Sequence, residues 1–290
     1  MSLLFTEVAD HLWTAPCRAL SMNTGILLDG PHAALIDPAL LPDEVEDIAA
    51  FCDGRGAQVE SVVLTHHHWD HILGAARFAQ AQVTAHRVFT AECVRELDRA
   101  RSAIARLYDA CGVGAPSFVM PGITQSVDGI MRLTVGNLHV LLFHTPGHAR
   151  DHLSVYDPDT CFLWAGDLLS DREIPFISDC LDMYERTLGM LAAMDIRVLV
   201  PGHGCVTADI AGIRDRIDAD RGYLADLRAR VQHAVSAGGS VDEAVASCAD
   251  MVFRFPEDNR DPHFMNVEQV FLELGGHVPT GSTIGWARES

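Results

Sequence analysis

Apolar and polar positions alternate through the first 120 residues in a pattern that predicts short strands joined by turns and helices. Strands are expected at residues 11–15, 25–28 and 33–36, as antiparallel neighbours, and a further strand ends at Leu64. Apolar positions at helical spacing predict helices at 42–51, 72–79 and 90–110, and a strand lies between the last two, at 83–85.

The same alternation returns after a loop that contains several Gly and Pro residues. Gly136-Asn137 is typical of a hairpin turn between two strands. The elements expected in this half are strands at 130–135, 138–143, 153–156 and 161–165, a helix at 181–194 and a strand at 198–200. Strands followed by a helix, twice over, predict two similar sheet-and-helix layers packed as an α/β sandwich.

Beyond residue 208 the pattern becomes wholly helical. Helices are expected over 208–237, 241–252 and 266–274, and no Pro- or Ser-rich linker precedes them. We therefore predict one domain over residues 1–206 and a helical extension over residues 207–290 that packs on it. A helical hairpin of this kind could equally form a dimer contact, so a homodimer is the alternative.

The composition narrows the classes of partner. The chain has 40 acidic and 21 basic residues, a formal charge of −19, which disfavours nucleic acid because phosphate binding requires clustered Lys and Arg. No apolar run approaches the ~20 residues of a membrane span, and the first residues lack a secretory pattern. Eight scattered cysteines without a C-x-x-C pair indicate reduced thiols. We therefore expect a cytoplasmic protein that acts on a small molecule, with no nucleic acid or membrane as partner.

The sequence T-H-H-H-W-D-H directly follows the apolar strand that ends the first run. Alternate side chains of an extended chain point the same way, so His66 and His68 can converge on one ion while His67 turns aside. Asp70 and His71 follow the turn and can face a second ion. Imidazole with carboxylate suits zinc, iron or manganese better than calcium or magnesium. The pattern predicts two divalent metal ions, with zinc as the first choice.

Three further apolar strands each end in a residue that can bind a metal. His148 follows Pro146-Gly147, which forces a tight turn. Asp167 follows Gly166, where a carboxylate could bridge two ions, and His203 lies between two glycines. One such strand end is weak evidence, because these residues are common in turns and caps. Together, and in this order, they make coincidence improbable.

With these motifs in place, the chain resembles the metallo-β-lactamase superfamily, an αββα sandwich with a dinuclear metal site. The resemblance extends from about residue 12 to residue 204 and implies a ligand set: His66, His68 and His148 at the first ion, Asp70, His71 and His203 at the second, and Asp167 bridging the two. Asp37, at the end of its strand, matches an aspartate that supports the ligands in this family. Thr65 and Gly74 fit the usual flanks of the histidine loop.

A closer resemblance is to members with D-H after the third motif, here Asp151-His152. These include thioesterase-like members with helical C-terminal additions, such as the quinolone signal response protein. It implies that the C-terminal helices pack over the active site, where Asp171, His263 and Asn266 would face the substrate; surface positions are the alternative. His152 either lines the pocket or orients a ligand. Structural roles are expected for four other histidines: His67, His86, His139 and His144.

The resemblance implies metal-assisted hydrolysis. Two divalent ions lower the pKa of a bridging water, so that hydroxide attacks at neutral pH. Asp70 is expected to orient this nucleophile and to shuttle its proton. Asp167 disfavours a true β-lactamase, which generally lacks an aspartate there, so a small ester, thioester or lactone is the predicted substrate. The alternatives are a phosphodiesterase or ribonuclease of the same fold, a mononuclear-iron persulfide dioxygenase, and a sensor that binds a ligand in the metal pocket.

Overall fold

A computed structural model of the chain describes residues 2–114 and 118–277, and two compact units are present. The first unit contains both β-sheets and consists of Met1–Thr145, Asp151–Gly166 and Ile196–Asp209. The second unit contains the later helices and consists of Pro146–Arg150, Asp167–Asp195 and Ile210–Ser290. The chain therefore passes between the units several times, and two short segments from the middle of the sequence belong with the C-terminal helices.

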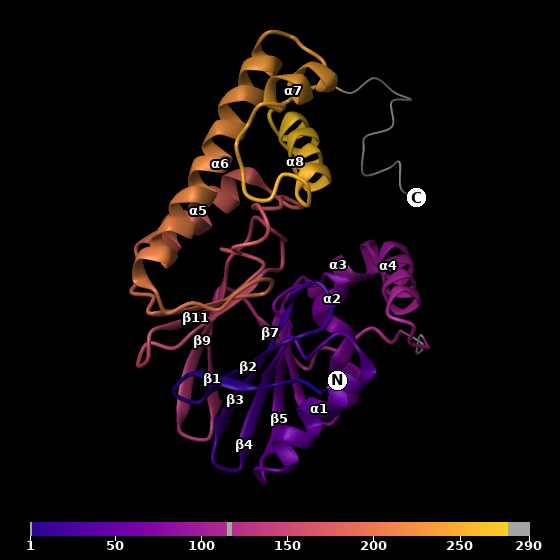
Figure 1. Ribbon diagram of the computed structural model, residues 1–290, viewed down its shortest axis with the longest axis vertical. Coiled ribbons are helices and arrows are strands. Elements are labelled where there is room, and N and C mark those ends of the chain that lie inside the picture. Colours follow the sequence, from indigo (N-terminus) through magenta and orange to yellow (C-terminus); the bar gives the residue numbers. More distant parts are fainter. Residues whose placement is uncertain (1, 115–117, 278–290) are drawn as a thin grey trace. The chain divides into compact units, whose positions relative to one another are not determined.

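The larger sheet of the first unit follows the chain order from edge to edge. Its strands are β1 (Thr6–Ala9), β2 (Leu12–Pro16), β3 (Asn23–Asp29), β4 (His32–Ile36), β5 (Gln58–Val63), β6 (Gln82–His86) and β7 (Gln125–Val127). Strands β1 to β4 pair antiparallel through short turns, and β4 to β7 pair parallel. Parallel neighbours need long crossover connections. Helices supply them (Figure 1): α1 (Pro42–Asp53), α2 (Trp69–Ile72), α3 (Phe89–Arg95) and α4 (Leu97–Ala110).

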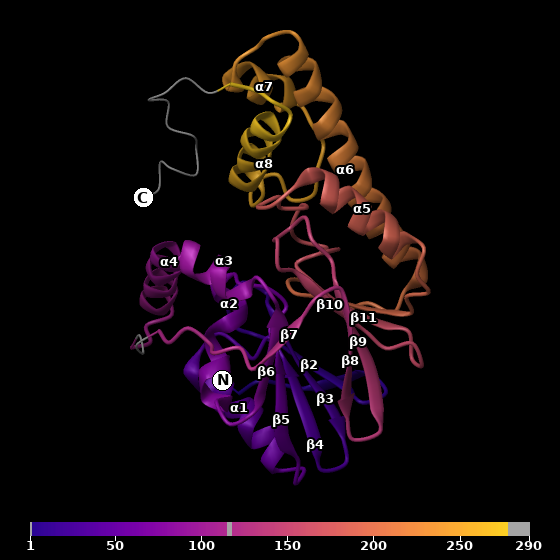
Figure 2. The ribbon, with the colours of Figure 1, turned by 180° about the vertical axis from the view of Figure 1, so that it is seen from behind.

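The smaller sheet contains β8 (Ile130–Val135), β9 (Leu138–His144), β10 (Leu153–Tyr156), β11 (Phe162–Gly166) and β12 (Val198–Pro201). Its order is β12-β11-β10-β9-β8, and only the pair β11 and β12 is parallel among these strands. The two sheets are seen together from behind in Figure 2. They face one another, because a Cβ atom built on Gly25 of β3 would lie 2.5 Å from the ring of Trp164 of β11.

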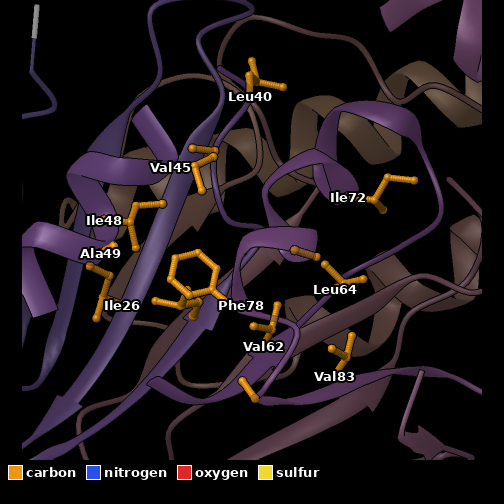
Figure 3. Packing of buried hydrophobic residues seen from close by; sticks show 14 of the residues in the cluster. Ile26, Leu40, Val45, Ile48, Ala49, Val62, Leu64, Ile72, Phe78 and Val83 are labelled. Carbon is orange, nitrogen blue, oxygen red and sulfur yellow. The ribbon is translucent and has the colours of Figure 1, made fainter. Parts of the chain in front are cut away.

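Two apolar layers stabilise the first unit. One lies between the sheets and includes Trp164 and Leu142, both fully buried. The other lies on the outer face of the larger sheet, where Val45 and Ile48 of α1 pack with residues of the central strands (Figure 3). Full burial of one such side chain contributes about 1.5–3 kcal/mol, so these layers fix the strand ends that carry the candidate ligands.

The second unit is helical. It contains α5 (Leu181–Ala192), α6 (Ile210–Ser236), α7 (Val241–Cys248) and α8 (Arg260–Glu273). Buried residues of α6 recur every three or four positions, as expected for one packed face. Ser240 and Glu243 form a capping box at the start of α7. In the described part of the chain, no helix has both the length and the apolar character for crossing a membrane.

The predicted mixed α/β architecture with two facing sheets is confirmed, and most expected elements lie within two residues of their predicted bounds. The prediction of a single helix over 90–110 is wrong, because the helical conformation is interrupted at Glu96, between α3 and α4. Strands β1 and β7 were not predicted, and both are short edge strands. Helix α8 begins at Arg260, six residues earlier than expected, because Pro262 is tolerated in a first helical turn.

Candidate metal centre

The histidine-rich loop begins where β5 ends and leads directly into the short helix α2. Thr65 and His66 are fully buried and precede the helix, whereas Asp70 and His71 lie on it. Gly74 follows, and a Cβ atom there would lie 1.6 Å from the carbonyl oxygen of Pro38. The close approach of these two backbones requires glycine, and it fixes α2 against the end of β4.

Asp37 anchors this loop from the end of β4. Its fully buried carboxylate accepts hydrogen bonds from the Thr65 backbone N–H at 2.8 Å, the Thr65 hydroxyl at 2.7 Å and His71 Nδ1 at 2.9 Å. The backbone of Asp37 has φ 45°, a left-handed conformation that Asp tolerates better than most residues. The predicted supporting position of Asp37 is therefore next to His71 in the structure.

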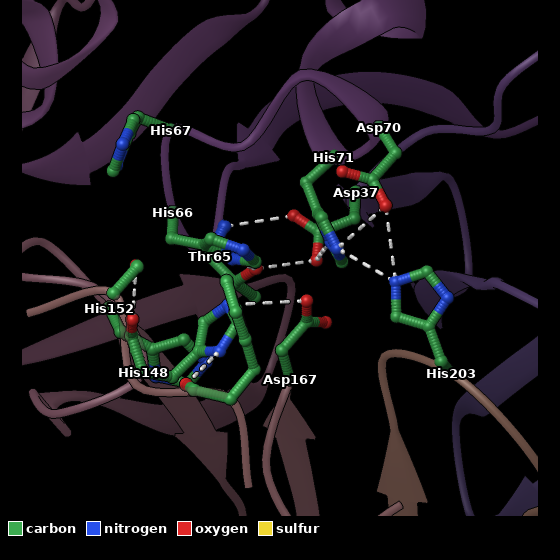
Figure 4. A network of polar contacts seen from close by, with 12 residues as sticks. Asp37, Thr65, His66, His67, Asp70, His71, His148, His152, Asp167 and His203 are labelled. Atoms are coloured by element: carbon green, nitrogen blue, oxygen red, sulfur yellow. Dashed lines mark hydrogen bonds and ion pairs between the residues drawn. The ribbon is translucent and has the colours of Figure 1, made fainter. Parts of the chain in front are cut away.

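Asp70, His71 and His203 bring their ligand atoms together in the first unit (Figure 4). His203 Nε2 lies 3.2 Å from Asp70 Oδ2 and 3.3 Å from His71 Nε2, and the third distance, His71 Nε2 to Asp70 Oδ2, is 3.8 Å. All three residues are buried. The end of β12 places His203 there, more than 130 residues after the helix that carries the other two.

The hydrogen bonds around this group fit a metal ion. His71 donates its Nδ1–H to Asp37, and His203 donates its Nδ1–H to the Leu20 carbonyl oxygen at 2.8 Å. The Nε2 lone pairs of both rings therefore face each other beside a carboxylate oxygen. Such electron-rich atoms repel in a buried site unless a proton or a metal cation lies between them. Two imidazoles and a carboxylate are a typical donor set for zinc and related divalent ions.

His148 and Asp167 belong to the second unit and lie next to each other. His148 Nε2 is 3.3 Å from Asp167 Oδ2. The ring of His148 donates from Nδ1 to the Phe176 carbonyl oxygen at 3.0 Å, which again leaves Nε2 for an ion. The Tyr184 hydroxyl donates to the backbone carbonyl of Asp167 at 3.4 Å. Burial raises the pKa of Tyr184 well above its usual value, so this hydroxyl stays protonated.

A glycine directly precedes each of these two residues and fixes the backbone there. Gly147, directly before His148, has φ 129°, and a Cβ atom there would lie 2.3 Å from the Cα atom of Tyr184. Gly166, directly before Asp167, has φ 57°, and a Cβ atom would lie 2.4 Å from His152 Nε2. Both positions combine a positive φ with no room for a side chain, so larger residues would displace the candidate ligands that follow.

His66 and His68, predicted as ligands of the first ion, lie in the unit of two sheets, and their ring centroids are 4.5 Å apart. The hydroxyl of Thr65, which donates to Asp37, lies 3.0 Å from His66 Nδ1 and can accept a hydrogen bond from its N–H. The residues predicted for the first ion thus divide between the two units, and their joint binding of one ion stays a prediction.

The residues predicted to line a substrate pocket are mostly engaged with other protein groups. His152 is fully buried and hydrogen-bonds through Nδ1 to Thr145 Oγ1 at 2.7 Å. His263 bonds to the Tyr223 hydroxyl and the Cys248 carbonyl, and Asn266 is fully buried. Asp171 lies 3.8 Å from Arg216. Contact of these residues with substrate stays a prediction.

Two pairs of side chains outside the candidate ligands contact each other: His67 with Asp151, and His86 with His144. His67 Nδ1 lies 2.7 Å from the buried carboxylate of Asp151. Burial lowers the pKa of His67, but the bond and charge of Asp151 outweigh burial, so its pKa is raised. The rings of His86 and His144 stack with centroids 4.1 Å apart. The sequence pattern did not indicate these pairs. It also did not indicate that the Leu20 and Phe176 carbonyls accept hydrogen bonds, because every residue has a backbone oxygen.

Comparison with known proteins agrees with the fold. The model of the metallo-beta-lactamase superfamily matches residues 22–203. The hydroxyacylglutathione hydrolase of Brucella anthropi is 28% identical over 191 residues, which cover 66% of this chain and 61% of that enzyme. The hydroxyacylglutathione hydrolase of Brucella ovis is 28% identical over 187 residues, 64% of this chain and 60% of the enzyme. The match thus spans less than two thirds of these relatives.

Solved structures share the fold over more of the chain. A metallo-beta-lactamase family protein from Thermus thermophilus has a TM-score of 0.67 and 22% identity, covering 92% of this chain and 94% of that one. The stereoselective inverting sec-alkylsulfatase Pisa1 from Pseudomonas sp. has a TM-score of 0.74 and 17% identity, covering 96% of this chain and 51% of that one. At such low identity these structures support the fold alone.

Proposed function

Since the chain belongs to the metallo-beta-lactamase superfamily, we propose that it is a metal-dependent hydrolase of a small thioester, ester or lactone. The observation that carries the proposal is the convergence of Asp70, His71 and His203. The Nδ1 atoms of the two histidine rings already donate to protein acceptors. We further propose that His66 and His68 of one unit and His148 and Asp167 of the other supply the ligands of a second ion. We therefore propose two divalent ions per chain, zinc first.

A thioester is the first choice among the three substrate classes. The Brucella relatives are named for hydrolysis of an acylglutathione, which is a thioester. Their 28% identity supports the choice without extending their substrate to this chain. The formal charge of −19 disfavours a ribonuclease, because an extended phosphate backbone needs a basic surface.

The residues of the site have separate tasks in the proposed reaction. Ions held there would supply a water acidic enough to attack at neutral pH and positive charge for the oxygen that becomes negative. Asp70, whose Oδ2 lies 3.2 Å from His203, would orient the attacking water, accept its proton and pass it to the leaving group. Asp37 and Thr65 would hold His71 and His66 in one ring orientation.

The test combines elemental analysis of purified protein with a panel of thioesters, lactones and phosphodiesters. We expect two zinc or related ions per chain, thioester turnover that a chelator removes, and its return when metal is added back. Asp70→Ala in metal-replete protein should lose at least about a hundredfold in kcat, because a positioned acid–base group contributes that much. Asp43→Ala is the control, since Asp43 is an exposed partner of Arg18.

Other outcomes would favour other functions. Full activity of the Asp70 variant would exclude the proposed mechanism. A single iron with oxygen uptake would favour a persulfide dioxygenase. Tight binding of a small ligand with no turnover of any substrate class would favour a sensor.

A further inference from the structure

The loop between β11 and α5, residues 168–180, is held by side chains from α8 and from the segment between α7 and α8, in its own unit. Arg254 donates to the carbonyl oxygens of Ser170 and Glu173. Asn259 accepts from the Ile174 N–H at 3.1 Å and donates to the Arg172 carbonyl at 2.9 Å. The loop starts directly after Asp167, so this attachment bears on a candidate metal ligand.

Asn266 of α8 makes the most specific of these attachments. Its Oδ1 accepts from the Ile177 N–H at 2.7 Å, and its Nδ2 donates to the Pro175 carbonyl at 2.7 Å. The amide therefore bridges the backbone on both sides of Phe176. Asn266 is fully buried, and both of its N–H groups are used, because Nδ2 also donates to the Tyr223 hydroxyl at 3.0 Å.

The segment bridged by Asn266 contacts His148 directly. The Phe176 carbonyl accepts from His148 Nδ1 at 3.0 Å, and the backbone N–H of Ser178 donates to the His148 carbonyl at 3.0 Å. The hydroxyl of Ser178 donates to the same carbonyl. Both the ring and the backbone of His148 are thus fixed by residues on either side of Ile177, which Asn266 binds.

A further set of hydrogen bonds fixes the orientation of the Asn266 amide. The Tyr223 hydroxyl accepts from Asn266 and so donates to His263 Nδ1 at 2.9 Å. His263 Nε2 then donates to the Cys248 carbonyl at 3.2 Å. This order requires a neutral imidazole, and burial lowers the pKa of His263, which favours that form. The amide therefore presents oxygen to Ile177 and nitrogen to Pro175.

We propose that Asn266 is a positioning residue of the metal centre, which holds residues 175–177 so that the Phe176 carbonyl fixes the ring of His148. The proposal rests on the proposed metal-dependent function, because His148 matters there as a ligand. It gives the C-terminal helices a role in metal binding through buried hydrogen bonds. Asn266 acts here through the loop, with no contact to substrate.

The test follows the ring of His148 by NMR in protein labelled with ¹⁵N-histidine. In metal-free protein, the Nδ1–H bonded to Phe176 should give a slowly exchanging resonance, assigned by its absence in His148→Gln. Asn266→Ala should broaden or remove this resonance. Zinc affinity, measured by competition with a chelating dye, should fall about ten- to a hundredfold, as for other residues that orient a metal-binding histidine.

Gln269→Ala is the matched control. Gln269 lies on the same helix and donates to the Asp179 carbonyl of the same loop at 3.1 Å, but it does not bridge Phe176. It should leave both the resonance and the zinc affinity unchanged. An Asn266→Ala protein with the wild-type resonance and zinc affinity would overturn the proposal, as would an equal effect of Gln269→Ala.

A second variant covers the case in which Asn266→Ala does not fold. Asn266→Asp keeps the shape and the acceptor for Ile177, but it places a carboxylate oxygen against the Pro175 carbonyl. It should shift the His148 resonance and weaken zinc binding in the same direction. A folded Asn266→Asp protein with wild-type values of both would also overturn the proposal. If the wild-type protein bound neither zinc nor a related divalent ion, the proposed function would fail, while the resonance would still decide whether Asn266 positions His148.

Discussion

The ligand group of Asp70, His71 and His203 and the pair of His148 and Asp167 are supported by different parts of the chain. The first group lies in the unit of two sheets, and its supports, the Asp37 carboxylate and the Leu20 carbonyl, lie in the same unit. His148 and Asp167 lie in the helical unit, where Phe176 and Tyr184 support them.

This difference separates two ways of holding a metal ligand. Asp37 and Thr65 follow the ends of neighbouring strands, β4 and β5, so the sheet that buries the core also fixes His71. His148 depends on a loop that is in turn held by Asn266, almost 90 residues further along the chain. Damage to the C-terminal helices should therefore affect His148 and leave the group around Asp70 intact.

The largest effect is expected for Asp37→Ala. The substitution leaves the Thr65 backbone N–H, the Thr65 hydroxyl and His71 Nδ1 without their buried acceptor. Removal of one partner from a buried charged network costs about 3–5 kcal/mol. Urea denaturation of metal-free protein should show this loss in the free energy of unfolding, and zinc content after dialysis should fall.

The Asp37→Ala substitution should leave the support of His148 unchanged, because that support lies in the helical unit. If folded, Asp37→Ala should keep the His148 ring resonance, because Phe176 and Asn266 are untouched. Loss of that resonance would show that the two groups share one support. Asp43→Ala serves as the control, because the exposed Asp43 pairs with Arg18 and should contribute less than about 1 kcal/mol.

Gly147→Ala should give the converse result with a smaller loss of stability. Gly147 has φ 129°, and the added Cβ atom would lie 2.3 Å from the Cα atom of Tyr184. Strain of this kind costs about 1–3 kcal/mol. We expect thermal denaturation at a lower temperature, a lost His148 resonance and weaker zinc binding.

A second glycine of the same unit supplies the control for Gly147→Ala. Gly189 lies inside α5 with nothing within 4 Å of an added Cβ atom. Gly189→Ala should stabilise the helix by up to about 1 kcal/mol through helix propensity. If the two alanine variants behaved alike, the tight turn before His148 would have no part in the site.

The sequence was sufficient to select the candidate ligands, but it did not show which groups orient them. His66, Asp70 and His203 follow apolar strands. The end of such a strand can be predicted from its own residues, so the position of these side chains at strand ends could be predicted too. Asn266 was singled out only through a family resemblance and as a substrate contact. Its bonds to residues 175 and 177 join segments 91 and 89 residues apart, and periodicity contains no information on such pairs.

The same limit explains the remaining differences in the fold. The hairpin of β8 and β9 was predicted from Gly136-Asn137, a local turn. Edge strands β1 and β7 are three or four residues long and have little pattern of their own, so their strand form depends on β2 and β6. Residues that end an apolar run can thus be predicted, whereas residues defined by a distant partner cannot.

The smallest expected effect concerns pH and the unit of two sheets. Burial, the stacked ring of His144 and Arg87 lower the pKa of His86 to about 4, although Asp151 and Asp128 act in the opposite direction. In the unfolded chain its pKa returns to about 6.5. Between these values the unfolded state binds a proton that the folded state does not, so stability falls as pH drops below 6.5.

His86→Gln isolates this contribution, because glutamine does not titrate. In metal-free protein, the free energy of unfolding of the wild type should fall between pH 7.5 and 5.5 by about 1 kcal/mol more than that of the variant. Urea denaturation at the two pH values measures the difference. The His148 resonance at pH 7.5 should be the same in both proteins, since Phe176 and Asn266 lie in the other unit. Equal pH dependence of the two proteins would mean that His86 is protonated as easily in the folded state as in the unfolded chain. Any loss of stability in acid would then come from other buried groups.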